Sequence, residues 1–172
     1  MNHIPVELYD ELLAYISENY IPDAEESTGV APAIYRDVEK GVDSLLPKQD
    51  AARLETLVDE IGETFSQMLL RLIDERGLSD VDVYKEAGID RKHFSKIRSN
   101  PSYHPRKSTI LAFAIALKLD LAETVDLLSR AEYALSPGSK GDLIVKFFIE
   151  HEIYDLDTIN YVLDEYGQPI LR

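Results

Sequence analysis

Apolar residues recur at every third or fourth position along most of the chain, the spacing that keeps them on one face of an α-helix. No segment shows the sustained apolar–polar alternation that is typical of β-strands. The pattern therefore predicts an all-α fold, built as a helical bundle. The first repeat comprises Leu8, Leu12, Leu13, Ile16 and Tyr20 and ends at Pro22; the second comprises Ile34, Val38, Val42 and Leu45 and ends at Pro47.

A third and longer repeat follows Asp50, a residue type that commonly caps helix N-termini. Its apolar positions run from Leu54 to Ile73 and stop before Gly77, which is a typical C-terminal signal. This pattern is consistent with one long helix that is kinked near Gly62.

From Ser79 onward the predicted elements are shorter and the turn signals are regular. Ser79 with Asp82 three residues later resembles a capping box, and Val83 and Ala87 supply a buried face before Gly88. Asp90 caps the next predicted helix, which buries Phe94 and Ile97 and carries basic residues on its other face.

The second half of the chain continues as helices. Residues 99–105 contain two prolines and do not continue a helix, after which Ser108 or Thr109 precedes the most apolar stretch, 110–119. Asp120 with Glu123 predicts a further helix that continues through Val125, Leu128, Ala131 and Leu135 to Pro137. Two last helices are predicted at 142–152 and 156–166, the latter closed by Gly167 and Pro169.

Length and composition bound the class of protein. The chain has 172 residues and 45% apolar content, which suits one buried domain with or without an appendage. It has no cysteine, which excludes disulfides, thiolate metal sites and cysteine nucleophiles. It shows neither a signal-peptide pattern nor an apolar run of about 20 residues, so we expect a cytoplasmic protein that does not span a membrane.

The charge is distributed unevenly. The formal net charge is −14, yet residues 63–141 hold 12 basic and 11 acidic side chains. The acidic excess lies in residues 1–62, with 14 acids and 4 bases, and in 142–172, with 7 acids and 2 bases. Within the central zone, residues 91–107 contain no acid and six bases: Arg91, Lys92, Lys96, Arg98, Arg106 and Lys107.

A short helix, a glycine turn and a second short helix with a basic face form the arrangement that places a recognition helix in the major groove. Residues 65–137 resemble the phage-repressor-like (Xre-type) helix-turn-helix family. The resemblance rests on Val83, Ala87, Gly88, Ile89, Phe94 and Ile97, and on Pro105, the following apolar helix and residues 119–123 (LDLAE).

The resemblance implies a repressor-like core with a recognition helix at about 90–99. Its base-contacting candidates are Arg91, Lys92, His93 and Ser95, and its phosphate-contacting candidates are Lys96, Arg98, Arg106 and Lys107. Proteins of this family commonly act as two-fold dimers, so a homodimer is implied as well. Two features depart from the family pattern: Tyr84 stands where a small residue is usual, and the connection containing Pro101 and Pro105 is long.

No constellation of catalytic or metal-binding residues stands out. The four histidines have no ligand spacing, and the glycines at 138 and 141 lack the spacing of a phosphate-binding loop. Acidic pairs such as Glu25 with Glu26 are expected in any chain with 32 acids. We therefore expect no catalytic residues, no metal and no cofactor.

These observations predict a sequence-specific double-stranded DNA-binding protein, a transcriptional regulator rather than an enzyme. Its organisation would be an acidic helical extension at 1–49, a helix-turn-helix core at 50–137 and an acidic helical extension at 138–172. The acidic ends would form a dimer interface, bind a protein partner through the N-terminal helices, or repel phosphate. The alternative is a non-enzymatic adaptor that uses the same fold to bind a protein.

Overall fold

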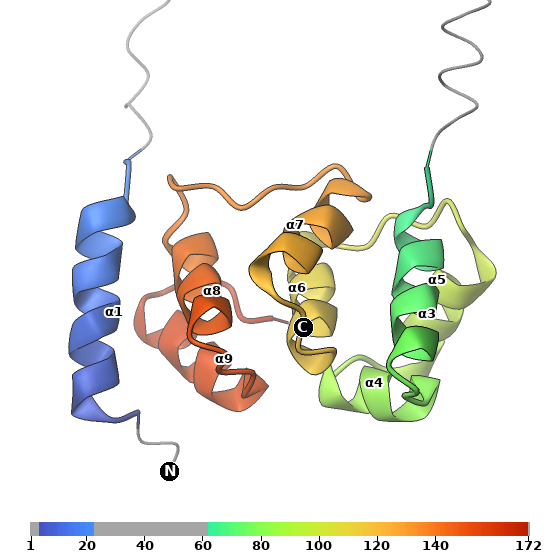
Figure 1. The fold of residues 1–172 in the computed structure, drawn as a ribbon, viewed down its shortest axis with the longest axis horizontal. Coiled ribbons are helices and arrows are strands. Elements are labelled where there is room, and N and C mark those ends of the chain that lie inside the picture. The colour runs from blue at the N-terminus through green and yellow to red at the C-terminus, as the bar shows by residue number, and fades with distance from the viewer. Residues whose placement is uncertain (1–3, 23–61, 172) are drawn as a thin grey trace, which may run out of the picture. The chain divides into compact units, whose positions relative to one another are not determined.

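A computed structural model describes residues 4–22 and 62–171 of the chain. The described residues form eight helices and no strand, which confirms the all-α prediction (Figure 1). The helices are α1 (Val6–Asn19), α3 (Phe65–Glu75), α4 (Asp80–Glu86), α5 (Arg91–Ser99), α6 (Lys107–Ala116), α7 (Leu121–Ser129), α8 (Lys140–Glu150) and α9 (Leu156–Glu165). None of them is long and apolar enough to cross a bilayer.

The described residues 4–22 and 63–171 belong to one compact unit. This unit joins the N-terminal helix to everything from α3 onward. The predicted helix at 34–45 and the apolar positions from Leu54 to Ile61 lie outside the described residues. The predicted boundaries at 49 and 137 stay predictions.

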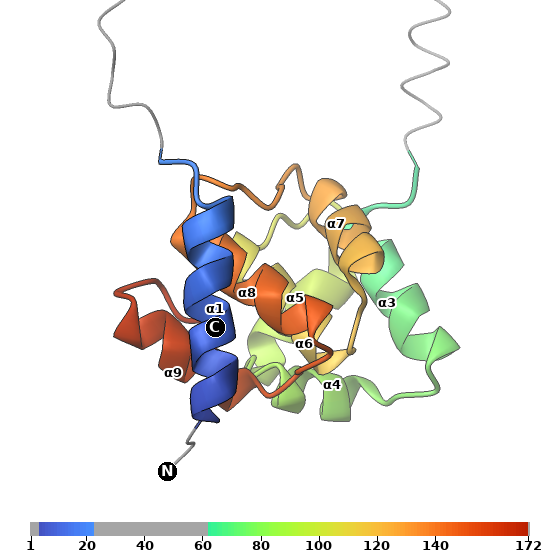
Figure 2. The ribbon, with the colours of Figure 1, turned by 60° about the vertical axis from the view of Figure 1, so that its left-hand side comes forward.

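Helix α6 is the centre of the core. Every residue from Thr109 to Ile115 is buried, as expected for a helix surrounded on all sides. Helices α4, α7 and α9 pack against α6, while α3 packs against α5 and α7 (Figures 1 and 2). This packing joins α3 to α7 around α6 and leaves one side of α5 open to solvent.

Helices α8 and α9 extend the core toward α1. Leu12 and Ile16 are the buried residues of α1, which packs on α8, and the ring of Tyr15 meets Phe147 with 5.4 Å between centroids. The backbone N–H of Ile21 donates to the carbonyl of Pro137 at 3.1 Å. The N-terminal helix is therefore held by the C-terminal part of the chain.

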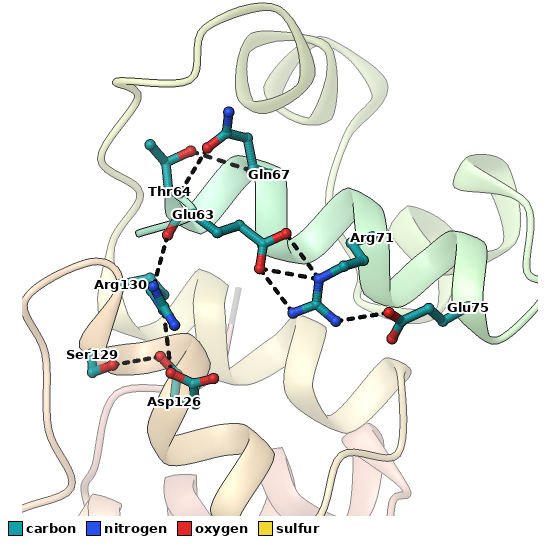
Figure 3. Close-up of polar contacts among 8 residues, drawn as sticks. All are labelled: Glu63, Thr64, Gln67, Arg71, Glu75, Asp126, Ser129 and Arg130. Atoms are coloured by element: carbon teal, nitrogen blue, oxygen red, sulfur yellow. Dashed lines mark hydrogen bonds and ion pairs between the residues drawn. The ribbon is translucent and has the colours of Figure 1, made fainter. Parts of the chain in front are cut away.

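Side-chain caps define where most of the helices begin. The hydroxyls and carboxylates of Ser79, Asp90 and Asp120 accept from the first turns of α4, α5 and α7, which confirms the three predicted caps. Thr64 and Gln67 form a full capping box at the start of α3, beside a bidentate pair between Arg71 and Glu63 (Figure 3).

The structure differs from the sequence expectations at several helix boundaries. Helix α8 begins and ends two residues earlier than the predicted 142–152. Residues 62–64 are not helical, because the extended Thr64 caps α3, so a helix continuous through Gly62 is wrong. Helix α6 begins at Lys107, directly after the extended Arg106, so Ser108 and Thr109 lie inside it. Helix α7 ends at Ser129 rather than near Pro137, because the left-handed Glu132 (φ 60°) turns the chain away.

Two apolar positions that the periodicity assigned to buried faces are exposed. Leu13 on α1 is 44% exposed and Val125 on α7 is 45% exposed. In α7 the buried face is formed by Thr124, Leu127 and Leu128, and Val125 points away from it.

Candidate nucleic-acid interface

Helices α4 and α5 are joined by a tight turn centred on Gly88. The N–H of Gly88 donates to the Lys85 carbonyl at 3.0 Å, and the N–H of Ile89 donates to the Tyr84 carbonyl at 2.8 Å. These bonds need a left-handed residue at 88, and Gly88 has φ +65°, which glycine adopts without steric cost. Asp90 then accepts from the N–H of His93 at 3.0 Å and starts α5.

The buried face of α5 fixes the rotation of this helix. Phe94 and Ile97 are both buried, which confirms the predicted register. The Phe94 ring lies between Tyr84 and Phe113, with centroid distances of 5.5 and 6.0 Å. The large residue Tyr84, which departs from the family pattern, is accommodated because its ring lies against Phe94.

The predicted base-contacting residues divide into two groups. Arg91, Lys92 and Ser95 are exposed on the outer face of α5, and neither base makes an ion pair within the described residues. His93 is half-buried, and its Nε2 lies 3.1 Å from the Tyr103 hydroxyl. The segment after α5 therefore folds back onto His93 and holds its ring.

The predicted phosphate-contacting residues also divide. Lys96 and Arg106 are exposed and make no ion pair with any other described residue. Arg98 forms an ion pair with Asp80 at the start of α4, and Lys107 forms one with Asp142 at the start of α8. Charges that are already paired have less attraction left for a phosphate.

A shallow groove lies between α4 and α5 and opens onto the exposed face of α5. Its volume is about 450 Å³, and its lining combines apolar side chains with the Asp80–Arg98 ion pair and the base Arg91. The groove is lined by Asp80, Val81, Tyr84, Arg91, Phe94, Ser95 and Arg98.

Helix α5 carries most of the positive charge of the α4–α5 pair. Helix α5 has four bases and no acid, whereas α4 and the turn contribute Asp80, Asp82, Glu86 and Asp90 against the single base Lys85. The pKa of Asp90 is lowered, chiefly because its carboxylate accepts the backbone N–H of His93. A polyanion would therefore have to approach from the outer face of α5.

Three residues that shape the region are absent from the predicted site. Asp80 neutralises Arg98, Asp142 neutralises Lys107, and Tyr103 holds His93. Tyr103 carried a usable signal, because it is the one tyrosine among basic residues. Asp80 and Asp142 lie 18 and 35 residues from the bases that they pair with, and no local pattern marks them.

Comparison with known proteins adds no relative. No protein-family model, curated protein or solved structure matches this chain. Within residues 4–22 and 62–171, no group of three or more histidine, aspartate or glutamate side chains is placed to hold a metal ion.

Proposed function

We propose that this protein is a sequence-specific double-stranded DNA-binding protein that regulates transcription, with α5 as its recognition helix. The observation that carries the proposal is the outer face of α5, where Arg91, Lys92, Ser95 and Lys96 are exposed and the helix itself contributes no acid. The opposite face is anchored in the core by Phe94 and Ile97, so these side chains are presented by a rigid element. An α-helix fits the major groove of B-DNA, where arginine and lysine recognise guanine.

The side chains have separate roles in this proposal. Arg91, Lys92 and Ser95 contact base edges because they lie on the first two turns of the helix that enters the groove. Lys96 and Arg106 contact phosphates. His93 positions the following segment through Tyr103, and Arg98 acts mainly within its pair with Asp80.

The test is a binding selection of the full chain from random double-stranded DNA, followed by titrations at several salt concentrations. Arg91→Ala should weaken the preferred site by roughly 5- to 150-fold, equivalent to about 1–3 kcal/mol, and relax the preference at one position. Arg106→Ala should weaken all sequences alike and lower the salt slope by about one.

The matched control is Lys146→Ala, which removes the same charge from α8 and should leave the sequence preference unchanged. Identical titrations for wild type, Arg91→Ala and Lys146→Ala would refute α5 as a recognition helix. An enriched palindrome with half-sites about one helical turn apart would support the two-fold dimer implied by the family resemblance.

A second candidate function is an adaptor that binds a protein through the same two helices. Asp82 favours it, because its carboxylate makes no ion pair with another described residue and repels a phosphate backbone that runs past the start of α4. Failure to enrich any sequence at low salt, where phosphate attraction is strongest, would favour the adaptor over the DNA-binding protein.

A further inference from the structure

Helix α1 carries a second apolar stripe besides the one that packs on α8. Val6, Tyr9 and Leu13 follow the i, i+3, i+7 spacing of a single helix face. Val6 is 72% exposed and Leu13 is 44% exposed, whereas Leu12 and Ile16 on the neighbouring face are buried. This second stripe therefore has no complete cover among the described residues.

The stripe lies along the edge of α1 that faces α9. After the hydrogen bond to Glu165 for Tyr161 and burial for Tyr166, Tyr9 also helps to raise the pKa of both hydroxyls, so it lies on the side of α1 nearest to the C-terminal half of α9. Figures 1 and 2 show α9 beside the N-terminal half of α1. Tyr161 is itself 48% exposed, so it continues the stripe onto the second helix. We call Val6, Tyr9, Leu13 and Tyr161 the α1–α9 face.

Acidic residues surround the α1–α9 face. Asp157, Asp164 and Glu165 lie one helical turn from Tyr161, and the Tyr161 hydroxyl donates to Glu165 at 2.8 Å. The exposed side of α1 adds Glu7, Asp10, Glu11 and Glu18. Residues 4–22 and 147–171 contain no lysine or arginine, and the one basic side chain among the described residues that meets these acids is His151, whose Nε2 lies 3.6 Å from the Glu11 carboxylate.

We propose that the α1–α9 face is a docking surface for a basic amphipathic helix of another protein. The exposed apolar side chains of α1 and α9 match a partner helix that presents its own apolar residues at i, i+3 and i+7. The lysines and arginines of such a helix then meet the surrounding carboxylates. A second copy docked through the same face brings acids against acids, and DNA is repelled, so the charges select a basic protein segment.

The α1–α9 face is tested with a defined probe, a fluorescently labelled 18-residue peptide of leucine and lysine in an amphipathic order. Its binding to the full chain is measured by anisotropy at about physiological ionic strength, where long-range attraction between exposed charges is screened. A scrambled peptide of the same composition is the control for non-specific attraction of a polycation. The ordered peptide should bind at least about tenfold more tightly, because only it presents a continuous apolar face.

Variants then locate the bound peptide. Val6→Ser and Leu13→Ser should each weaken binding by about fivefold, because each removes apolar surface that the peptide covers. Asp164→Asn should weaken it less, and the loss should diminish in high salt. The matched control is Val125→Ser on α7, because Val125 is as exposed as Leu13. It should leave binding unchanged.

Val6→Ser keeps the test independent of folding, since this residue is 72% exposed. Equal affinity for the ordered and scrambled peptides would overturn the proposal. If Val125→Ser weakens peptide binding and Val6→Ser does not, the peptide binds between α7 and α8, and the proposal is overturned as well. A dimer of the wild-type chain that Leu13→Ser dissociates would show that a second copy covers the face instead.

Discussion

Breaking the contact between Lys107 and Asp142 should destabilise the fold strongly, although both residues are charged and lie at helix starts. The carboxylate of Asp142 pairs with the Lys107 ammonium and also accepts the backbone N–H of Ser136 at 2.7 Å. The Asp142 side chain is only 8% exposed and that of Lys107 is 27% exposed. This contact joins the beginning of α6 to the beginning of α8.

The magnitude follows from burial. Removing one partner of a buried ion pair costs about 3–5 kcal/mol, because the other charge loses its compensation. In Asp142→Ala the remaining Lys107 can still reach water, which favours the lower end of this range, while the Ser136 N–H loses its acceptor. We therefore expect a loss of about 3 kcal/mol for Asp142→Ala. For a domain of this size that is a decrease in Tm of roughly 6–12 °C.

The assay is a double-mutant cycle read by circular dichroism in urea and by heating. Asp142→Ala, Lys107→Ala and the double variant should show a coupling energy of about 1–3 kcal/mol. The matched control is Asp126→Ala, since Asp126 also pairs with a base, Arg130, but its side chain is 48% exposed. The control substitution should lower the free energy of unfolding by about 0–1 kcal/mol.

A Tm for Asp142→Ala within about 2 °C of wild type, or additive effects in the cycle, would refute the assignment of a buried pair. The result also bears on the DNA-binding proposal. If Lys107→Ala unfolds the protein at low urea, then its loss of DNA affinity says nothing about phosphate contacts. Arg106 is the cleaner test because it is exposed and has no ion pair within the described residues.

Three further outcomes are expected. Phe94→Ala should lower the free energy of unfolding by about 3–5 kcal/mol, because it leaves a cavity between α4 and α6. Lys96→Ala should change it by less than about 0.5 kcal/mol. Equal unfolding curves for the two variants would contradict the helix register. Gly88→Ala should lower the free energy of unfolding by about 1–2 kcal/mol. The whole loss comes from backbone strain at φ +65°, because an added Cβ would meet only ordinary van der Waals contacts. An unchanged Tm would contradict this. Burial raises the pKa of Tyr15, and burial together with the Tyr9 hydroxyl raises the pKa of Tyr166 to about 12. The stability that these two neutral tyrosines contribute is therefore complete below about pH 10 and is lost as the pH rises toward the raised pKa values. Circular dichroism between pH 9 and 12 checks this, and flat stability in that range would contradict it.

Local signals predicted the α4–α5 region well. A cap, a glycine turn and two apolar residues three apart lie within a few positions of one another, so Asp90, Gly88, Phe94 and Ile97 could be placed from the sequence. Their surroundings do not alter these short-range geometric preferences. The register of α5 follows from them directly.

The neighbours of the basic residues could not be predicted in this way. Arg98 and Lys107 belong to one acid-free run in the sequence, yet each is neutralised by a carboxylate from another helix. Charge counted along a chain does not show which side chains fold next to each other. Leu13 shows the same limit, because periodicity marks a position as apolar and only the packing of α1 on α8 decides which of two adjacent stripes is covered.

The packing of α1 on α8 also has a consequence for synthesis of the protein. Helix α1 leaves the ribosome before α8, the helix that covers Leu12 and Ile16, which is completed about 130 residues later. At translation rates of about 5–20 residues per second, that is a delay of roughly 7–26 s. During this interval the apolar side of the nascent α1 is open to chaperones and to other chains. A rare-codon pause placed before α8 should therefore increase chaperone capture of the nascent chain, whereas the same pause after α9 should not.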